Sequence, residues 1–311
     1  MNIYHKLEKY EHKKMNNTHK IYNIKYKFYK NMMGGFTSIN KIYIRALNDF
    51  IKEHNKTVDS AKQIDDSHGV YHALMVLCHT EKALNAYKKQ DDISEIDILK
   101  VKLAALLHDI DDSKYFENNT EYQNARIILQ NTHTLSPDNI NDIIKMISWV
   151  SASKNGDNIP DECIGKEYML YPRYADRLEA IGIIGVERTL EYTLHKNQPL
   201  CIPKENNPKI TIEQIYDDIA TEERYKKYTG KSISMMDHFY DKLLRLGKYP
   251  IRNKYFDDEC AKRQKPLEDI ALLYEKQGYI KEEKVREYIE KNKSISTTCE
   301  CNDEVSKFSF L

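Results

Sequence analysis

The segment with the clearest capacity for chemistry is LAALLHDIDDSKYF, residues 103 to 116. It begins as an apolar helical pattern, and its later part carries one histidine, three aspartates and one lysine: His108, Asp109, Asp111, Asp112 and Lys114. Carboxylates are unfavourable at the C-terminal end of a helix, because the helix dipole is already negative there. A positive group is therefore expected beside these aspartates, and the rest of the chain points to a metal ion.

Further potential ligands lie on both sides of this segment. His72 lies upstream in SHGVYHALMV, and Asp176 lies downstream in YPRYADRLEAIGIIG. With His108 and Asp109 they supply two imidazoles and two carboxylates from three predicted helices. A donor set of nitrogen and oxygen without thiolate suits an octahedral ion better than structural zinc. The sequence therefore predicts one divalent metal ion, with Mn²⁺ favoured and Mg²⁺, Fe²⁺, Ni²⁺ or Co²⁺ as alternatives.

The elements that must position these residues are predicted to be helices. Residues 94–110 and 136–150 carry apolar side chains at steps of three and four, with Ser94 and Ser136 as candidate N-caps. Residues 174–192 and 232–246 also show a helical pattern. Glycine is scarce, at 10 of 311 residues, and no hairpin signal lies between alternating apolar residues. The predicted fold class is therefore an all-α helical bundle.

The chain is predicted to comprise one domain with an extension at each end. Residues 1–40 contain eight lysines and two glutamates, which makes them a basic polar N-terminal extension. Residues 41–290 form the predicted domain, in which the proline-rich segment 196–210 is a loop. Residues 291–311 lack periodicity and are predicted to be a flexible tail.

Overall composition excludes some classes of protein. Lys+Arg and Asp+Glu are both 48, so no global charge favours nucleic acid. The N-terminus has no apolar signal-peptide region, and no run of about 18 apolar residues occurs. The six cysteines are scattered and show no zinc-site spacing. These features predict a cytoplasmic protein whose cysteines are reduced.

Several motifs occur in the order that resembles the HD-domain superfamily of metal-dependent phosphohydrolases. The matching blocks are SHGVYH, LHDIDDSK, ISWVSASKNG, RYADRLEAIGIIGVERT and HFYDKLLRL, spread over roughly residues 45 to 285. They are most similar to the small bacterial and fungal HD hydrolases that include nucleoside triphosphate pyrophosphohydrolases. The chain departs from that pattern at Gly69, where an acid is usual, and after His72, where ALMV replaces the usual Arg-Val.

The resemblance implies roles for individual residues. His72, His108, Asp109 and Asp176 correspond to the metal ligands. The predicted catalytic residues are Asp112, which would orient the attacking water, together with Lys114 and His68, which would face phosphate charge. The predicted substrate-binding residues are Lys154, Arg173 and Arg177.

The resemblance also implies the reaction class. The expected activity is hydrolysis of a (deoxy)nucleoside triphosphate between its α and β phosphates, releasing pyrophosphate. Two alternatives remain open: an HD-type nucleotidase or phosphodiesterase, and a nucleotide-binding protein whose HD site no longer turns over. The expected partner is a nucleotide substrate, with no membrane partner. Nucleic acid is expected only through the basic N-terminal extension, and a homodimer stays open.

Overall fold

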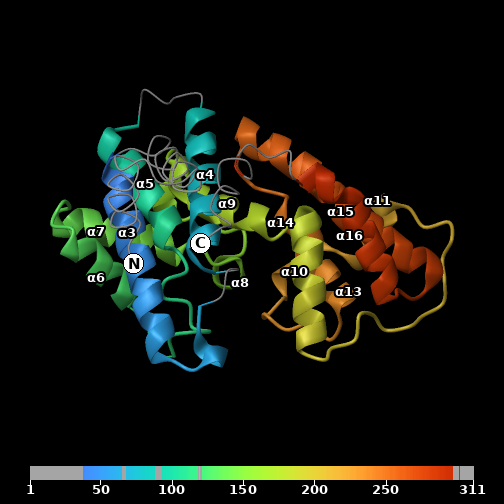
Figure 1. The fold of residues 1–311 in the computed structure, drawn as a ribbon. Coiled ribbons are helices and arrows are strands. Elements are labelled where there is room, and N and C mark those ends of the chain that lie inside the picture. Colours follow the sequence, from blue (N-terminus) through green and yellow to red (C-terminus); the bar gives the residue numbers. More distant parts are fainter. Residues whose placement is uncertain are drawn as a thin grey trace, which may run out of the picture. The chain divides into compact units, whose positions relative to one another are not determined.

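The computed structural model describes residues 38–64, 68–87, 93–117, 119, 121–296 and 301. The described residues form helices joined by loops and contain no strand (Figure 1). The predicted all-α fold class is therefore confirmed. The predicted N-terminal extension lies outside the described residues, apart from residues 38–40, which begin the first described helix.

The described chain divides into two compact units, which are treated separately. The first contains residues 38–78, 93–148 and 301, and the second contains residues 79–92 and 149–299, within the described ranges. Both units fall largely within the single domain predicted over residues 41–290. The predicted domain boundaries stay predictions.

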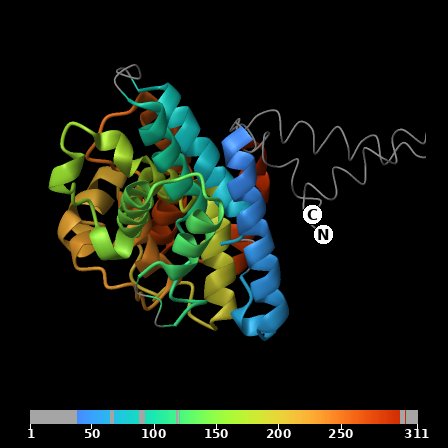
Figure 2. The same cartoon turned by 90° about the vertical axis from the view of Figure 1, so that its left-hand side faces the viewer.

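The first unit is built from helices around a buried central helix. Its helices are α3 (Ser38–Thr57), the start of α4 (Val70–Asn85), α5 (Glu95–Leu107), α6 (Gln123–Asn131) and α7 (Pro137–Ser148), with a 3₁₀ turn at Ser60–Lys62. Helix α5 packs against α3 and α7, and α6 packs against the same two helices. Figure 2 shows α3 along its length. Because α5 has neighbours on both sides, nearly all of its residues from Lys100 to Leu107 are buried.

The predicted caps of two helices are present. The Ser94 hydroxyl accepts a hydrogen bond from the Asp97 backbone N–H at 3.2 Å, and Ser136 accepts one from Asn139 N–H at 3.3 Å. The predicted apolar stripe of α7 is buried, whereas Ile96 at the start of α5 is 39% exposed. The first turn of α5 therefore lies outside the core, although its apolar residue fits the helical pattern.

A disulfide joins Cys78 on α4 to Cys301, with Cα atoms 5.8 Å apart. The prediction that the cysteines are all reduced is therefore wrong for this pair. The two residues are 223 positions apart in the chain, so their spacing in the sequence carried no sign of the contact. Cys163, Cys201 and Cys260 are free thiols.

The second unit contains the end of α4 and the remaining described helices. These are α8 (Ala152–Asn155), α9 (Tyr171–Glu179), α10 (Gly182–His195), α11 (Ile212–Gln214), α12 (Glu222–Lys226), α13 (Met235–His238), α14 (Leu244–Leu246), α15 (Lys254–Gln277) and α16 (Glu282–Ser296). Short 3₁₀ turns lie at Asp161–Cys163 and Glu167–Leu170, and π-helical turns lie at Ile215–Ile219 and Phe239–Leu243. Helix α10 packs against α9, α15 and α16.

The helical pattern over residues 174–192 corresponds to two helices rather than one. Helix α9 ends at Glu179, and α10 begins at Gly182, which has a φ of +80°. That left-handed conformation is available to glycine at little cost and interrupts the regular helix. The apolar periodicity continues across the break, which explains why the sequence reads as one helix.

Two other expectations for the second unit are met. The segment 196–210 is a loop, as predicted, and residues 235–246 form continuous helical structure around the π-helical turn. Within the described residues, none of the helices is both long and apolar enough to span a bilayer.

Candidate metal centre

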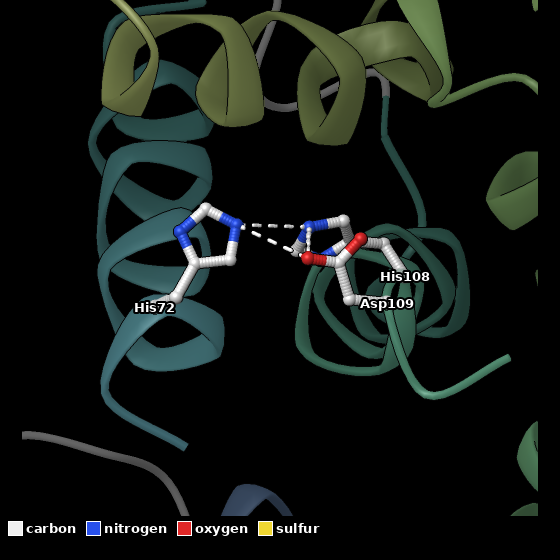
Figure 3. A group of neighbouring side chains, drawn as sticks. All are labelled: His72, His108 and Asp109. Atoms are coloured by element: carbon white, nitrogen blue, oxygen red, sulfur yellow. Dashed lines mark hydrogen bonds and ion pairs between the residues drawn. The ribbon is translucent and has the colours of Figure 1, made fainter. Parts of the chain in front are cut away.

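Three of the four predicted metal ligands meet in the first unit. His72 lies on α4, whereas His108 and Asp109 lie where α5 ends (Figure 3). The two Nε2 atoms are 3.2 Å apart, and Asp109 Oδ2 lies 3.4 Å from His72 Nε2 and 3.3 Å from His108 Nε2. Both histidines are buried, and the Asp109 side chain is 22% exposed. Two nitrogens and one oxygen thus face a common point.

The spacing of these three atoms fits a shared metal ion. Ligands about 2.1 Å from an ion lie about 3.0 Å apart at a right angle and about 3.4 Å apart at the tetrahedral angle. The observed separations of 3.2–3.4 Å fall within that interval. The same three residues form the cluster of potential metal ligands found among the described residues.

The protonation of the triad also suits metal binding. His108 Nδ1 lies 2.9 Å from the Ala105 carbonyl oxygen, and since that oxygen can only accept, Nδ1–H is the donor. Nε2 is then the ring nitrogen that can bind a metal, once the ion takes the place of any proton on it. Burial alone would raise the pKa of Asp109, but the neighbouring His108 and His72 hold it well below its usual range. Asp109 is therefore a carboxylate.

The three predicted catalytic residues form a second group beside this triad. The Lys114 ammonium lies 2.9 Å from His68 Nε2 and 3.8 Å from Asp112 Oδ2. Asp112 Oδ1 also accepts a hydrogen bond from the Lys114 backbone N–H at 2.9 Å. Two contacts connect this group to the triad. Asp112 N–H donates to the Asp109 carbonyl at 3.0 Å, and the His68 and His72 ring centroids are 6.3 Å apart.

Asp111 has a different environment from Asp112. Its two carboxylate oxygens accept the backbone N–H groups of Asn124 and Ala125 at 2.9 Å each, and the Asn119 side-chain amide also donates to it. These backbone donors belong to the first turn of α6. Asp111 therefore caps α6, although it precedes that helix in the sequence by more than ten residues. Burial raises the pKa of Asp111, while these three donors oppose the rise.

The two predicted substrate-binding arginines are buried in the second unit. Arg173 donates to the carbonyl oxygens of Trp149 and Asn158, at 2.7 Å each. Arg177 donates to Asp157 Oδ1 at 2.6 Å and to the Gly156 carbonyl at 2.5 Å. Each side chain is 1% exposed. The arginines therefore hold the loop 149–158, and their contact with substrate stays a prediction.

Two further predicted site residues lie in the same unit. Asp176 lies on α9, and Lys154 lies on α8 and is exposed. Their roles as fourth metal ligand and phosphate contact stay predictions.

One residue near the catalytic group was missed by the sequence interpretation. The Tyr115 hydroxyl lies 3.2 Å from His68 Nδ1. In the sequence it is one of 23 tyrosines, and nothing in its immediate neighbours distinguishes it.

His79 is a fully buried histidine outside the candidate metal centre. Its Nδ1 contacts the Tyr255 hydroxyl at 2.6 Å, and its Nε2 contacts Glu179 Oε1 at 3.0 Å. Arg263 donates to the same Glu179 oxygen at 3.1 Å. Burial lowers the pKa of His79, despite the opposing effect of its hydrogen bond to the Glu179 carboxylate. It therefore belongs to a satisfied polar network within the second unit.

Comparison with known families agrees with the site. Residues 69–181 match the model of the HD domain. This range contains His72, His108 and Asp109. Since the HD domain holds this candidate metal centre, the protein is a metal-dependent phosphohydrolase. The chain thus carries an HD domain over these residues. It belongs to the same family as the uncharacterised protein L803 of Acanthamoeba polyphaga mimivirus, which is 34% identical over 259 residues. That alignment covers 78% of this chain and 99% of the viral protein.

Solved structures with a related arrangement are more distant. A Lactobacillus plantarum protein superposes with a TM-score of 0.48 at 21% identity. An HD-superfamily hydrolase of Bacillus thuringiensis does so with a TM-score of 0.46 at 19% identity. Each comparison covers 74% of this chain and 94% of the other.

Proposed function

We propose that the chain hydrolyses a nucleoside or deoxynucleoside triphosphate between the α and β phosphates, releasing a monophosphate and pyrophosphate. The supporting observation lies within the first unit. Three donors suited to a divalent ion adjoin a lysine ammonium that two other side chains hold. Enzymes catalyse phosphoryl transfer mainly by positioning the reactants and by neutralising negative charge. A bound divalent ion beside a lysine ammonium provides both.

The metal ligands, Asp112 and Lys114 have different proposed roles in hydrolysis. When bound, a divalent ion supplies Lewis acidity to a phosphoryl oxygen and lowers the pKa of water. The motif position of Asp112 supports a role as the acceptor that orients the attacking water and takes its proton. Its Oδ2 lies 3.8 Å from the Lys114 ammonium, which keeps both groups in one place. Lys114 retains N–H donors beyond the one directed at His68, and these face the charge of the phosphate oxygens.

For four residues of the second unit, the support for a functional role is their position in the matched motifs. Asp176 is proposed as the fourth metal ligand, and Lys154, Arg173 and Arg177 as residues that serve substrate binding. All four lie within residues 69–181, the range that matches the HD domain. For the arginines, the hydrogen bonds to the loop 149–158 support a contribution through that loop.

The test is a panel of nucleotides assayed with Mn²⁺, in which pyrophosphate and orthophosphate are measured separately. Release of pyrophosphate from a triphosphate is the expected result, with Asp112→Asn as the inactive control. Release of orthophosphate from a monophosphate, or cleavage of a diester, would replace the proposal by the nucleotidase or phosphodiesterase alternative. Binding of nucleotides by calorimetry without any turnover would show a binding protein instead.

A further inference from the structure

Helix α6 begins without a cap of its own. Its N-cap residue, Tyr122, has a left-handed backbone with a φ of +55°, and its side chain makes no capping hydrogen bond. Gln123 N–H donates instead to Asn119 Oδ1 at 3.1 Å. The next two N–H groups donate to the two carboxylate oxygens of Asp111 at 2.9 Å each. The donors that every helix leaves free at its start are therefore satisfied by residues that precede α6 in the chain.

Asn124, the second residue of α6, also binds the preceding segment with its side chain. Its amide nitrogen Nδ2 donates to the Ile110 carbonyl oxygen at 3.0 Å, while its backbone N–H is one of the two donors to Asp111. A carbonyl oxygen can only accept, so the side-chain nitrogen of Asn124 must face it. Asn124 therefore holds two successive residues, Ile110 and Asp111, with two hydrogen bonds.

The Ile110 carbonyl lies next to a candidate metal ligand. Residues 109–112 follow the end of α5 and begin with Asp109. On one side the backbone of Asp109 is held by α5, because Ile110 N–H donates to the Leu107 carbonyl oxygen at 3.3 Å. On the other side it is held by the hydrogen bond from Asn124. Each residue has only two soft backbone torsions, so holding the peptide groups on both sides restricts the direction in which the Asp109 side chain leaves the chain.

We propose that Asn124 is a positioning residue of the metal centre. By holding the Ile110 carbonyl oxygen, it keeps the Asp109 carboxylate directed at the point that the Nε2 atoms of His72 and His108 face. Asn124 acts on the ligand through the backbone of Ile110. The inference deepens the proposed function: it rests on the metal centre of that function and not on the identity of the nucleotide.

The first test measures metal binding by the Asn124→Ala variant. This change removes the side-chain donor but keeps the backbone N–H that Asp111 accepts, and alanine favours a helix more than asparagine does. Titration of the metal-free variant with Mn²⁺ should give a Kd about 10-fold higher than that of the wild type, as for other residues that orient metal ligands. The absorption spectrum of bound Co²⁺ should also change, because it reports the arrangement of the ligands. An unchanged Kd and spectrum would overturn the proposal.

Asn55 on α3 offers a matched control within the first unit. Its side-chain amide donates to the Ile64 carbonyl oxygen at 3.0 Å, which is the same kind of contact at the same distance. Asn55→Ala should lower the free energy of unfolding in urea at least as much as Asn124→Ala, because Asn55 also accepts from Ile64 N–H. It should leave the Kd for Mn²⁺ and the Co²⁺ spectrum unchanged. Equal losses of Mn²⁺ affinity in both variants would show general loosening of the unit and would overturn a specific role of Asn124.

The second test uses hydrogen exchange and needs no metal. Asp112 N–H donates to the Asp109 carbonyl oxygen at 3.0 Å, so it reports the order of this segment. In the metal-free protein this N–H should exchange faster in Asn124→Ala than in the wild type, and at the wild-type rate in Asn55→Ala. An unchanged rate in Asn124→Ala would contradict the proposal.

Failure of this inference and failure of the proposed function give different results. If the wild type binds no Mn²⁺, the metal centre fails, and the proposed function and the role of Asn124 fail with it. If the wild type binds Mn²⁺ and Asn124→Ala binds it equally well, the metal centre stands and the role of Asn124 alone is refuted.

Discussion

The Nε2 atoms of His72 and His108 lie 3.2 Å apart, although the residues come from different helices and are 36 positions apart in the chain. His108 is held in this orientation by its Nδ1–H bond to the Ala105 carbonyl one helical turn earlier. Two imidazole nitrogens that point at one place, next to a carboxylate, are well placed to share a cation. The first two predictions follow from this relationship.

Removing one donor of the triad should remove the metal. We expect the purified protein to retain one divalent ion per chain, and Asp109→Ala to lose it, because the change removes the carboxylate that faces both imidazoles. Elemental analysis of wild type and variant, with the helical circular dichroism spectrum as a check of folding, measures this. Asp138→Ala on α7 is the control and should keep its metal. Undiminished metal in Asp109→Ala would contradict the site.

Asp176→Ala tests the proposed fourth ligand separately. If Asp176 binds the ion, the variant should lose metal as Asp109→Ala does, while its helical content stays unchanged. Full metal retention in Asp176→Ala alongside loss in Asp109→Ala would confine the protein ligands to the three residues of the first unit.

Changing Asp112 to asparagine should affect turnover, whereas changing Asp111 to asparagine should affect stability. Asp112→Asn should lower turnover by about 10²- to 10⁴-fold with little change in the free energy of unfolding, because it removes a proton acceptor. Asp111→Asn should lower the free energy of unfolding by about 1–3 kcal/mol, because an amide cannot accept from both Asn124 and Ala125 with its two heteroatoms. Urea unfolding and steady-state kinetics measure the two quantities. Equal and small effects of both variants on turnover would remove Asp112 from the mechanism.

The buried arginines should act through the loop 149–158. Arg173→Lys keeps the charge but cannot donate to the carbonyl oxygens of both Trp149 and Asn158 in the same geometry. We expect a loss of about 3 kcal/mol in the free energy of unfolding and faster hydrogen exchange in the loop. The exposed Arg286→Lys is the matched control. A higher KM with unchanged stability and exchange would instead indicate direct contact with substrate.

Acidification should destabilise the protein partly through His238. Burial, with the nearby Lys242 charge, lowers the pKa of His238 to about 4. The unfolded chain, with a histidine pKa near 6.5, binds more protons between these two values, so the free energy of unfolding falls as the pH drops from about 6.5 to about 4. His238 contributes at most about 3 kcal/mol to this fall. Replacing it by glutamine should flatten the profile in that window, whereas replacing the exposed His195 should not.

The N-terminal extension should be dispensable for hydrolysis. Residues 1–37 precede α3 and every matched motif, so a chain beginning at Ser38 should keep its activity. The lysines of this segment would attract an anionic partner such as nucleic acid, and that attraction would weaken with salt. Hydrolysis and salt-dependent binding of DNA or RNA by full-length and truncated chains test the two expectations separately. Complete loss of hydrolysis in a folded truncation would show that the extension completes the active site.

Several features of this protein were readable from the sequence because they depend on short-range patterns. The all-α class, α5 and α7 with their serine caps, and the loop 196–210 follow from periodicity and from residues within one or two turns. The assignment of His72, His108 and Asp109 to one site came from motif order, and the structure confirms that they meet.

Other features were decided by contacts between residues far apart in the chain. The Cys78–Cys301 disulfide, the capping of α6 by Asp111, and the arginine bonds to loop 149–158 each join segments with no common pattern. The Tyr115–His68 contact spans 47 positions. Periodicity reports which face of a helix is apolar, but it does not report which distant polar atom satisfies a buried donor. That choice is made only when the helices pack, and it determined which aspartate caps a helix and which one remains available for chemistry.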